Sequence, residues 1–103
     1  MTRYLVDTDV LIWVLRGKPE AIAWVEAAAM SGELWCSALT VSEILRMVRE
    51  DELPKTEALL DSLQIAPGTA EDARHAAHLL RHRGPGFVDC HIAATALRLH
   101  GQF

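Results

Sequence analysis

Short apolar runs alternate along this chain with longer stretches in which apolar residues recur every three or four positions. The short runs lie at residues 3–6, 34–38 and 64–66 and predict three buried strands. The longer stretches predict helices over about 9–15, 19–31, 40–48, 69–83 and 88–99, with another after Pro54 that extends through Leu63. Gly17 and a turn at residues 84–86 are expected to separate neighbouring helices.

This alternation of strands and helices predicts a parallel sheet, because each helical segment carries the chain back across the sheet in a right-handed crossover. The expected fold class is α/β, with a small parallel sheet flanked by helices. With 103 residues, half of them hydrophobic, the chain is expected to form one domain over residues 1–103.

Composition narrows the range of functions. No apolar run approaches the roughly 18–20 residues of a membrane-spanning helix, so we expect a cytoplasmic protein with no membrane partner. Cys36 and Cys90 lie far apart and are expected to be buried thiols. The net charge of −4 argues against wholesale neutralisation of a nucleic acid backbone, but it is compatible with acids that bind a metal ion.

Four acids are expected at the carboxyl ends of the strands, the edge at which parallel sheets form their sites. Asp7 and Asp9 follow the first strand, Glu43 lies in the helix after the second strand, and Asp89 begins the last helix. Helical spacing places Asp89 on the same face as Ile92 and Ala96, which predicts a carboxylate on the inward side of that helix.

Each acid also has a structural interpretation. Either Asp9 or Asp7 is suited to cap the helix that follows the first strand, and Asp89 is suited to cap the last helix. The segment Thr40–Val41–Ser42–Glu43 fits a capping box, in which Glu43 reaches back to the start of its own helix. We prefer a site role for Asp7 and Asp89, and for Glu43 alone the capping role.

A group of three or four carboxylates is a hard, oxygen-only ligand set that suits Mg²⁺ or Mn²⁺ better than zinc. Such groups serve phosphodiester hydrolysis. The chain has no Gly-rich phosphate loop, so a nucleoside triphosphate site is not expected.

Three segments resemble the successive motifs of PIN domains, especially the VapC-type toxins of bacterial toxin–antitoxin pairs. They are YLVDTDVLIWVLRG from Tyr4, SALTVSEIL from Ser37 and VDCHIAATALRLHG from Val88. The resemblance implies a metal-dependent endoribonuclease whose Mg²⁺ or Mn²⁺ is held by Asp7, Glu43 and Asp89, which are also its catalytic residues. It further implies an RNA substrate, a cognate antitoxin and a homodimer.

The chain departs from the PIN pattern in two places. Family members usually carry Ser or Asn where Asp9 stands, which makes Asp9 either an additional metal ligand or the helix cap. They also continue after the last helix into a further strand and a fourth metal-site residue. We therefore expect a PIN-like domain that is truncated at its C-terminus, lacks the last strand or strands, and has an exposed sheet edge that favours dimerisation.

Two basic features are weaker candidates. Arg46 and Arg49 follow Glu43 along the same helix and could contact RNA phosphates, although we slightly prefer a solvated helix surface. His75, His78 and His82 share one face of a polar helix, which indicates either a metal or RNA contact or, as we prefer, a solvated face.

Two other functions remain open from the sequence. An Asp-x-Asp pair after a first strand also occurs in haloacid dehalogenase-type phosphatases, in which the first Asp is a covalent nucleophile. No suitably placed Lys and no later pair of acids supports that alternative. The second alternative is a catalytically inactive PIN-like module that only binds an antitoxin or another copy of itself.

Overall fold

Three parallel strands form the sheet at the centre of the computed structural model, which describes residues 2–83 and 86–99. They are β1 (Thr2–Leu5), β2 (Gly32–Ser37) and β3 (Gln64–Ala66), in the order β1-β2-β3. Thr2 pairs with Gly32 and Trp35 pairs with Gln64, so β2 is the central strand. The predicted parallel sheet and α/β class are confirmed.

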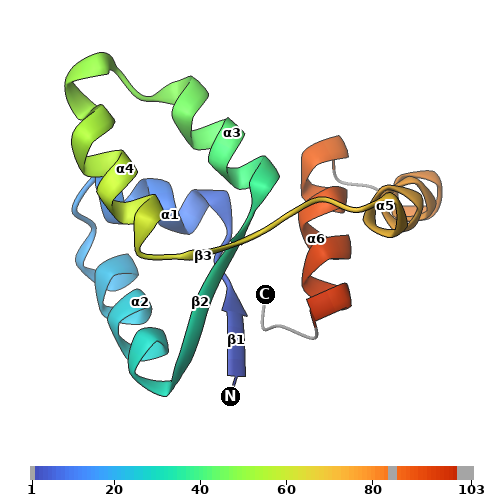
Figure 1. Ribbon diagram of the computed structural model, residues 1–103, viewed down its shortest axis with the longest axis horizontal. Coiled ribbons are helices and arrows are strands. Elements are labelled where there is room, and N and C mark those ends of the chain that lie inside the picture. The colour runs from blue at the N-terminus through green and yellow to red at the C-terminus, as the bar shows by residue number, and fades with distance from the viewer. Residues whose placement is uncertain (1, 84–85, 100–103) are drawn as a thin grey trace.

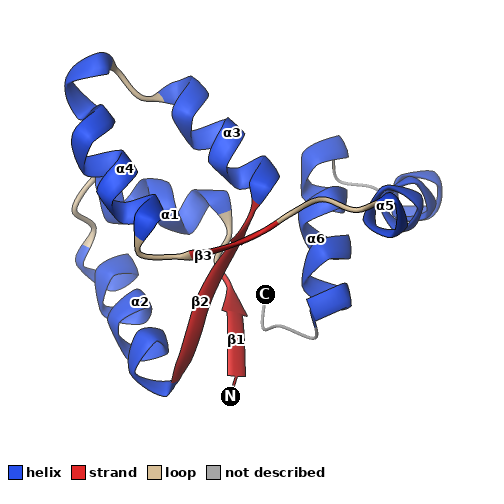
Figure 2. Ribbon diagram, in the orientation of Figure 1, coloured by secondary structure: helices blue, strands red, loops and turns tan. Residues whose placement is uncertain are grey.

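Within the described ranges, six α-helices and one short 3₁₀ helix surround the sheet (Figures 1 and 2). Their bounds are α1 Thr8–Leu15, α2 Pro19–Ser31, α3 Ala38–Met47, η1 Glu50–Glu52, α4 Leu53–Asp61, α5 Ala70–Arg83 and α6 Phe87–Leu99. Gly17 separates α1 from α2 with a φ of 76°, a left-handed conformation that glycine adopts without strain. Of the turn predicted at residues 84–86, positions 84 and 85 lie outside the described residues.

Alternate side chains of the sheet face two different helical layers. Val6 and Cys36 belong to one apolar cluster, with Leu11, Ile44 and Leu60 from α1, α3 and α4. Figure 1 shows α1 to α4 on one side of the sheet and α6, followed by α5, on the other. The two-residue period of a strand therefore divides the core between two layers.

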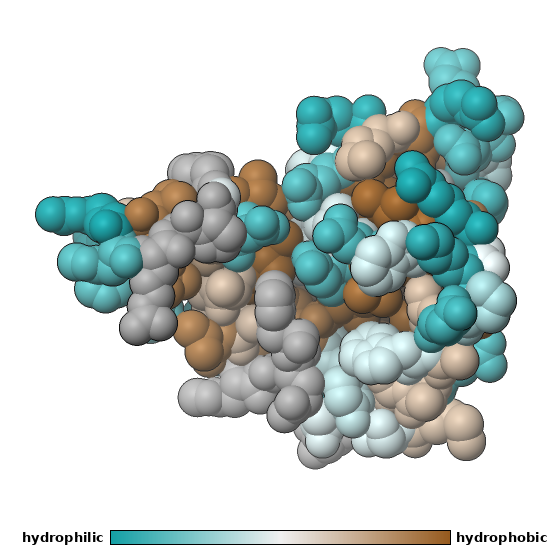
Figure 3. All heavy atoms as spheres, turned by 180° about the vertical axis from the view of Figure 1, so that it is seen from behind, coloured by the Kyte–Doolittle hydropathy of each residue, from teal (hydrophilic) through white to brown (hydrophobic). Residues whose placement is uncertain are grey.

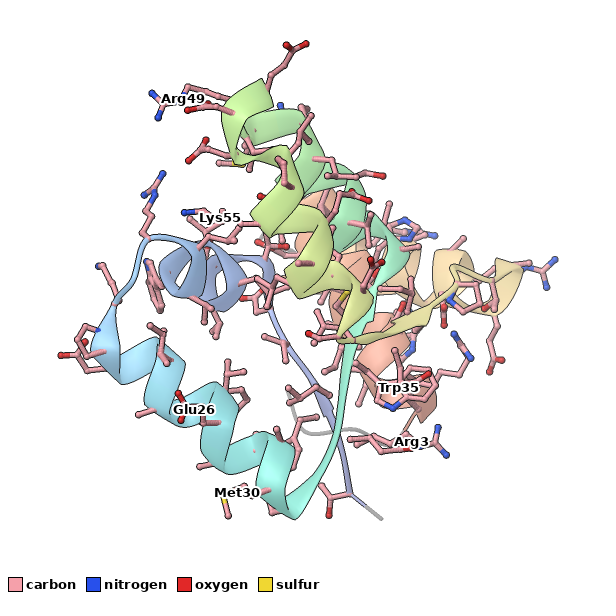
Figure 4. The ribbon with its side chains drawn as sticks, turned by 60° about the vertical axis from the view of Figure 1, so that its left-hand side comes forward. Arg3, Glu26, Met30, Trp35, Arg49 and Lys55 are labelled. Carbon is pink, nitrogen blue, oxygen red and sulfur yellow. The ribbon has the colours of Figure 1, made fainter. Side chains whose placement is uncertain are left out.

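The opposite face of the sheet packs on α6. Leu5 forms a second cluster with Ile92 and Ala96, against which Trp35 packs. The guanidinium of Arg3 lies over the Trp35 ring, 5.6 Å from its centroid, and Figure 4 shows the two side chains next to each other. This packing fixes α6, which carries Asp89, against the first two strands.

Both cysteines are free and buried, as predicted. Burial raises the pKa of the Cys36 thiol to about 11, so this thiol stays protonated at neutral pH. Among the described helices, none is both long and apolar enough to cross a lipid bilayer.

Candidate metal centre

Asp7 lies in the short connection between β1 and α1. The last backbone hydrogen bond along β1 runs from the Val6 N–H to the Trp35 carbonyl, at 2.7 Å. Asp7 follows in an extended conformation, and its Oδ1 accepts a 2.7 Å hydrogen bond from the Thr8 N–H. Asp7 is therefore the N-cap of α1, while Asp9 is exposed in the first turn. Of the two acids that could have capped this helix, the structure selects Asp7.

The predicted capping box at Thr40 and Glu43 is wrong. Helix α3 begins at Ala38, and the Ser37 hydroxyl caps it by accepting a 3.1 Å hydrogen bond from the Leu39 N–H. Thr40 consequently lies inside the helix, fully buried, and cannot act as a cap. Glu43 is half-buried, and its Oε1 accepts a 2.6 Å hydrogen bond from the Thr8 hydroxyl. The Glu43 carboxylate is thus bound to the start of α1, at the end of β1.

Thr8 links the first two candidate acids, a role that the sequence analysis missed. Its N–H binds Asp7 and its hydroxyl binds Glu43, while its Oγ1 lies 3.1 Å from the Thr40 Oγ1. A hydroxyl has one proton to donate, and the carboxylate is the stronger acceptor, so the Thr40 hydroxyl donates to Thr8. The available signal was a small hydroxyl residue between two acids directly after a strand.

Asp89 lies in the first turn of α6 and is its third residue, so it is not the N-cap of this helix. Its side chain is exposed, although Ile92 and Ala96 on the same helix are buried. The prediction of an inward-facing carboxylate is therefore wrong. Because Asp89 sits at the end of the helix, solvent reaches a face that is covered one turn later.

The electrostatic environment of Asp7 reflects the other acids. Burial raises the pKa of Asp7, and the hydrogen bond from the Thr8 N–H offsets part of this effect. The negative charges of Asp9, Asp89 and Glu43 raise the pKa further. Elements far apart in the sequence, α1, α3 and α6, thus bring negative charge to the carboxyl end of β1.

A divalent cation fits this donor set chemically, because the acids supply hard oxygen ligands whose mutual repulsion a positive charge would relieve. The acids do not form a closed cage. Within residues 2–83 and 86–99, no group of three His, Cys, Asp or Glu side chains stands close enough to hold one metal ion. The fit is therefore one of chemistry and electric field, with Asp7 and Glu43 joined through Thr8.

The two arginines proposed for RNA contact lie near the far end of α3. Arg46 is exposed in the last turn of the helix. The Arg49 Nε lies 3.6 Å from a carboxylate oxygen of Asp51 and 3.7 Å from one of Glu52, both in η1. Figure 4 shows Arg49 extending from this end of the molecule, with Lys55 nearby. RNA binding by these residues stays a prediction.

A buried acid outside this group, Asp72, was also missed by the sequence analysis. Its carboxylate accepts hydrogen bonds from the Arg98 Nε at 2.9 Å, the Thr95 hydroxyl at 3.2 Å and the Thr69 N–H at 3.3 Å. Burial by itself would raise the pKa of Asp72, but the hydrogen bond and charge of Arg98, with the other donors, hold it below its usual value. This ion pair joins the start of α5 to the end of α6.

Comparison with known proteins identifies the family to which this fold and these motifs belong. The family model of the PIN domain matches residues 4–103. The chain belongs to the PIN domain family. This PIN domain is 37% identical over 97 residues to Ribonuclease VapC10 of Mycobacterium tuberculosis, an alignment that covers 89% of the chain and 73% of the relative. It is 36% identical over 99 residues to Ribonuclease VapC19 of the same species, covering 90% and 79%.

Solved structures confirm the fold of this PIN domain. A toxin–antitoxin complex from Klebsiella pneumoniae matches with a TM-score of 0.84 and 22% identity, covering 98% of this chain and 82% of that one. VapBC2 from Rickettsia felis, bound to a DNA fragment from its promoter, matches with a TM-score of 0.83 and 18% identity, covering 97% and 84%. Together with the match to the PIN family model, this confirms the resemblance to PIN domains, and the haloacid dehalogenase alternative is set aside.

Proposed function

We propose that this PIN domain is the ribonuclease toxin of a toxin–antitoxin pair and cleaves RNA with a divalent metal ion. Asp7, Glu43 and Asp89 hold the ion, which is Mg²⁺ or Mn²⁺, and Asp9 adds negative charge beside it. Kinship with two VapC ribonucleases over about nine-tenths of the chain supports the reaction. The oxygen-only donors support the choice of metal.

The main support for this site assignment is the negative electrostatic potential that the other acids create at Asp7. Three other acids raise the pKa of this half-buried carboxyl, and two of them come from other helices, α3 and α6. A fold gains no stability from placing like charges together. Their convergence is instead typical of a site that takes up a positive ion.

The residues of the chain divide the work. When bound, a divalent metal ion supplies Lewis acidity, which activates water and stabilises charge on the departing oxygen. Asp7 presents a carboxylate whose Oδ1 is fixed by the Thr8 N–H. Glu43 is oriented through one oxygen by the Thr8 hydroxyl. Asp89, exposed in the first turn of α6, adds a third carboxylate from the other side of the sheet.

The partners follow from the same kinship. We propose a cognate antitoxin that holds the toxin inactive, because one structural neighbour is described as a toxin–antitoxin complex and another as VapBC2. We also propose a homodimer and an RNA-binding role for Arg46 and Arg49, both exposed beyond Glu43 on the α3 side.

Cleavage of a single-stranded RNA by the purified chain, with Mg²⁺, Mn²⁺ or a chelator, tests the function. We expect cleavage that requires the metal and that falls at least a hundredfold in Asp7→Asn, Glu43→Gln and Asp89→Asn. Asp9→Asn is the matched control, since it removes an equal charge two residues from Asp7, and we expect a smaller loss.

Two outcomes would contradict the proposal. Unchanged RNA cleavage by Asp7→Asn would show that the reaction does not depend on these carboxylates. Absence of cleavage from a folded chain that still binds an antitoxin would favour the inactive interaction module.

A further inference from the structure

Two histidines on the outer surface of α5 lie outside the carboxylate site. His78 and His82 are four residues apart, a separation at which helical side chains are neighbours on one face. Both side chains are exposed, and their ring centroids are 4.5 Å apart with the ring planes tilted by 51°. Figure 3, which views the molecule from behind, shows hydrophilic side chains over the end formed by α5.

The separation of the two rings matches the geometry of two imidazoles bound to one metal ion. A metal–nitrogen bond of about 2.0–2.1 Å puts each ring centroid roughly 3.2 Å from the ion. At coordination angles of about 90–110°, such rings have centroids roughly 4.5–5.2 Å apart. The observed 4.5 Å lies at the lower end of this range, so the spacing of the two rings is compatible with a shared ion.

We propose that His78 and His82 form a two-ligand site for a divalent transition-metal ion such as Zn²⁺, Ni²⁺ or Cu²⁺, with water completing its coordination. Imidazole nitrogen suits these ions, whereas Mg²⁺ and Mn²⁺ are better served by oxygen donors. The site is therefore distinct in both place and chemistry from the carboxylates around Asp7.

The neighbouring residues define the limits of this site. His75 lines a separate cavity of about 430 Å³ with Asp72 and Arg98, one turn closer to the start of α5. No set of three potential ligands occurs among the described residues, so the site has two protein ligands. Arg74 and Arg81 on the same helix are exposed, and their positive charge lowers the affinity by an amount that salt screens.

Calorimetric titration with Ni²⁺ in excess Mg²⁺ tests the site, because Mg²⁺ competes for oxygen ligands and leaves imidazoles free. We expect one Ni²⁺ per chain, with binding weakened at least tenfold in His78→Ala and in His82→Ala. His75→Ala is the first control and should leave the isotherm unchanged.

A second control keeps the number of histidines constant. The double variant Ala77→His/His78→Ala turns one imidazole about 100° around the helix axis, away from His82. All of these positions except the half-buried His75 are exposed, so the fold should persist, and circular dichroism confirms it. We expect this variant to bind Ni²⁺ as weakly as His78→Ala does.

Thermal unfolding gives an independent readout, since an ion that binds the native state raises the midpoint of unfolding. Ni²⁺ should raise it in the parent chain and not in the double variant. If the double variant binds as tightly as the parent, or if His75→Ala weakens binding as much as His78→Ala, the two-histidine site is refuted. Ribonuclease activity plays no part in either readout, so the result is independent of the proposed function.

Discussion

Replacing Thr8 with valine tests the link between Asp7 and Glu43 most sharply, because valine keeps the shape of the side chain and removes the hydroxyl. Thr8 is 7% exposed, and its hydroxyl lies 2.6 Å from the Glu43 Oε1. A hydrogen bond to a charged group contributes about 1.5–3 kcal/mol. Thr40, which is fully buried, also loses its partner, and an unpaired buried hydroxyl costs about 1 kcal/mol or more.

The free energy of unfolding should therefore fall by about 2–4 kcal/mol in Thr8→Val. In a domain of this size each kcal/mol lowers the midpoint of thermal unfolding by roughly 4–8 °C. Urea unfolding measures the difference, with Thr8→Ser as the matched control because serine retains the hydroxyl. Thr8→Ser should lose about 1 kcal/mol, the value of one buried methyl group.

A double-mutant cycle of Thr8→Val with Glu43→Gln isolates the hydrogen bond from the other effects. If the bond is charge-assisted, the two substitutions together should cost at least 1 kcal/mol less than the sum of each alone. Additive costs, or a Thr8→Val variant as stable as Thr8→Ser, would refute the inference that Thr8 holds Glu43 in place.

Three further predictions address other parts of the molecule. The pKa of Asp7 is raised in the folded state, so ionisation of this carboxyl lowers the stability of the fold as pH rises. Asp7→Asn keeps a good helix cap and should therefore raise the midpoint of thermal unfolding of the metal-free protein at pH 7. A lower midpoint would contradict this prediction. The pKa of Asp72 is lowered, so the stability it contributes is present above about pH 4 and lost as pH falls through its folded-state pKa. Asp72→Asn should cost about 3 kcal/mol in urea unfolding at pH 7 and less at pH 3, because it breaks a buried pair with Arg98; an equal cost at both pH values would count against the pair. A Cβ on Gly32 would lie 2.3 Å from the Thr2 carbonyl oxygen, so Gly32→Ala should lower the free energy of unfolding by about 1–3 kcal/mol. An unchanged urea unfolding curve would contradict this, because it would mean that β1 and β2 move apart at little cost.

Sequence patterns predicted the fold well where the signal is local. The strand at residues 64–66 and the helix from Pro19 to Ser31 were placed correctly, because apolar spacing and a proline at the first helical position are properties of adjacent residues. The acids also lie at the carboxyl ends of the strands, as expected, because the direction of each strand follows from the alternation of strands and helices.

Features that depend on distant contacts could not be read in the same way. The Thr40–Glu43 spacing fits a cap, yet Ser37, three residues earlier, is an equally good cap and begins the helix. Glu43 then found its partner in Thr8, 35 positions away in the sequence. Helical spacing likewise grouped Asp89 with Ile92 and Ala96 but did not show that the Asp89 side chain is exposed.

The pairing of Asp72 with Arg98 shows the same limit. The sequence separation is 26 residues, and Asp72 lies outside the three motifs quoted from the sequence. The threonine three positions before Asp72 indicated only the start of a helix, which the structure confirms through the hydrogen bond from the Asp72 N–H to the Thr69 hydroxyl.

Titration of the metal-free protein with Mn²⁺, followed by electron paramagnetic resonance of the free ion, tests the central claim most directly. The account predicts saturable binding of Mn²⁺ that weakens at least tenfold in Asp7→Asn and in Asp89→Asn and is little changed in His78→Ala. Binding that is equally tight in Asp89→Asn would contradict a site shared between the end of β1 and the start of α6.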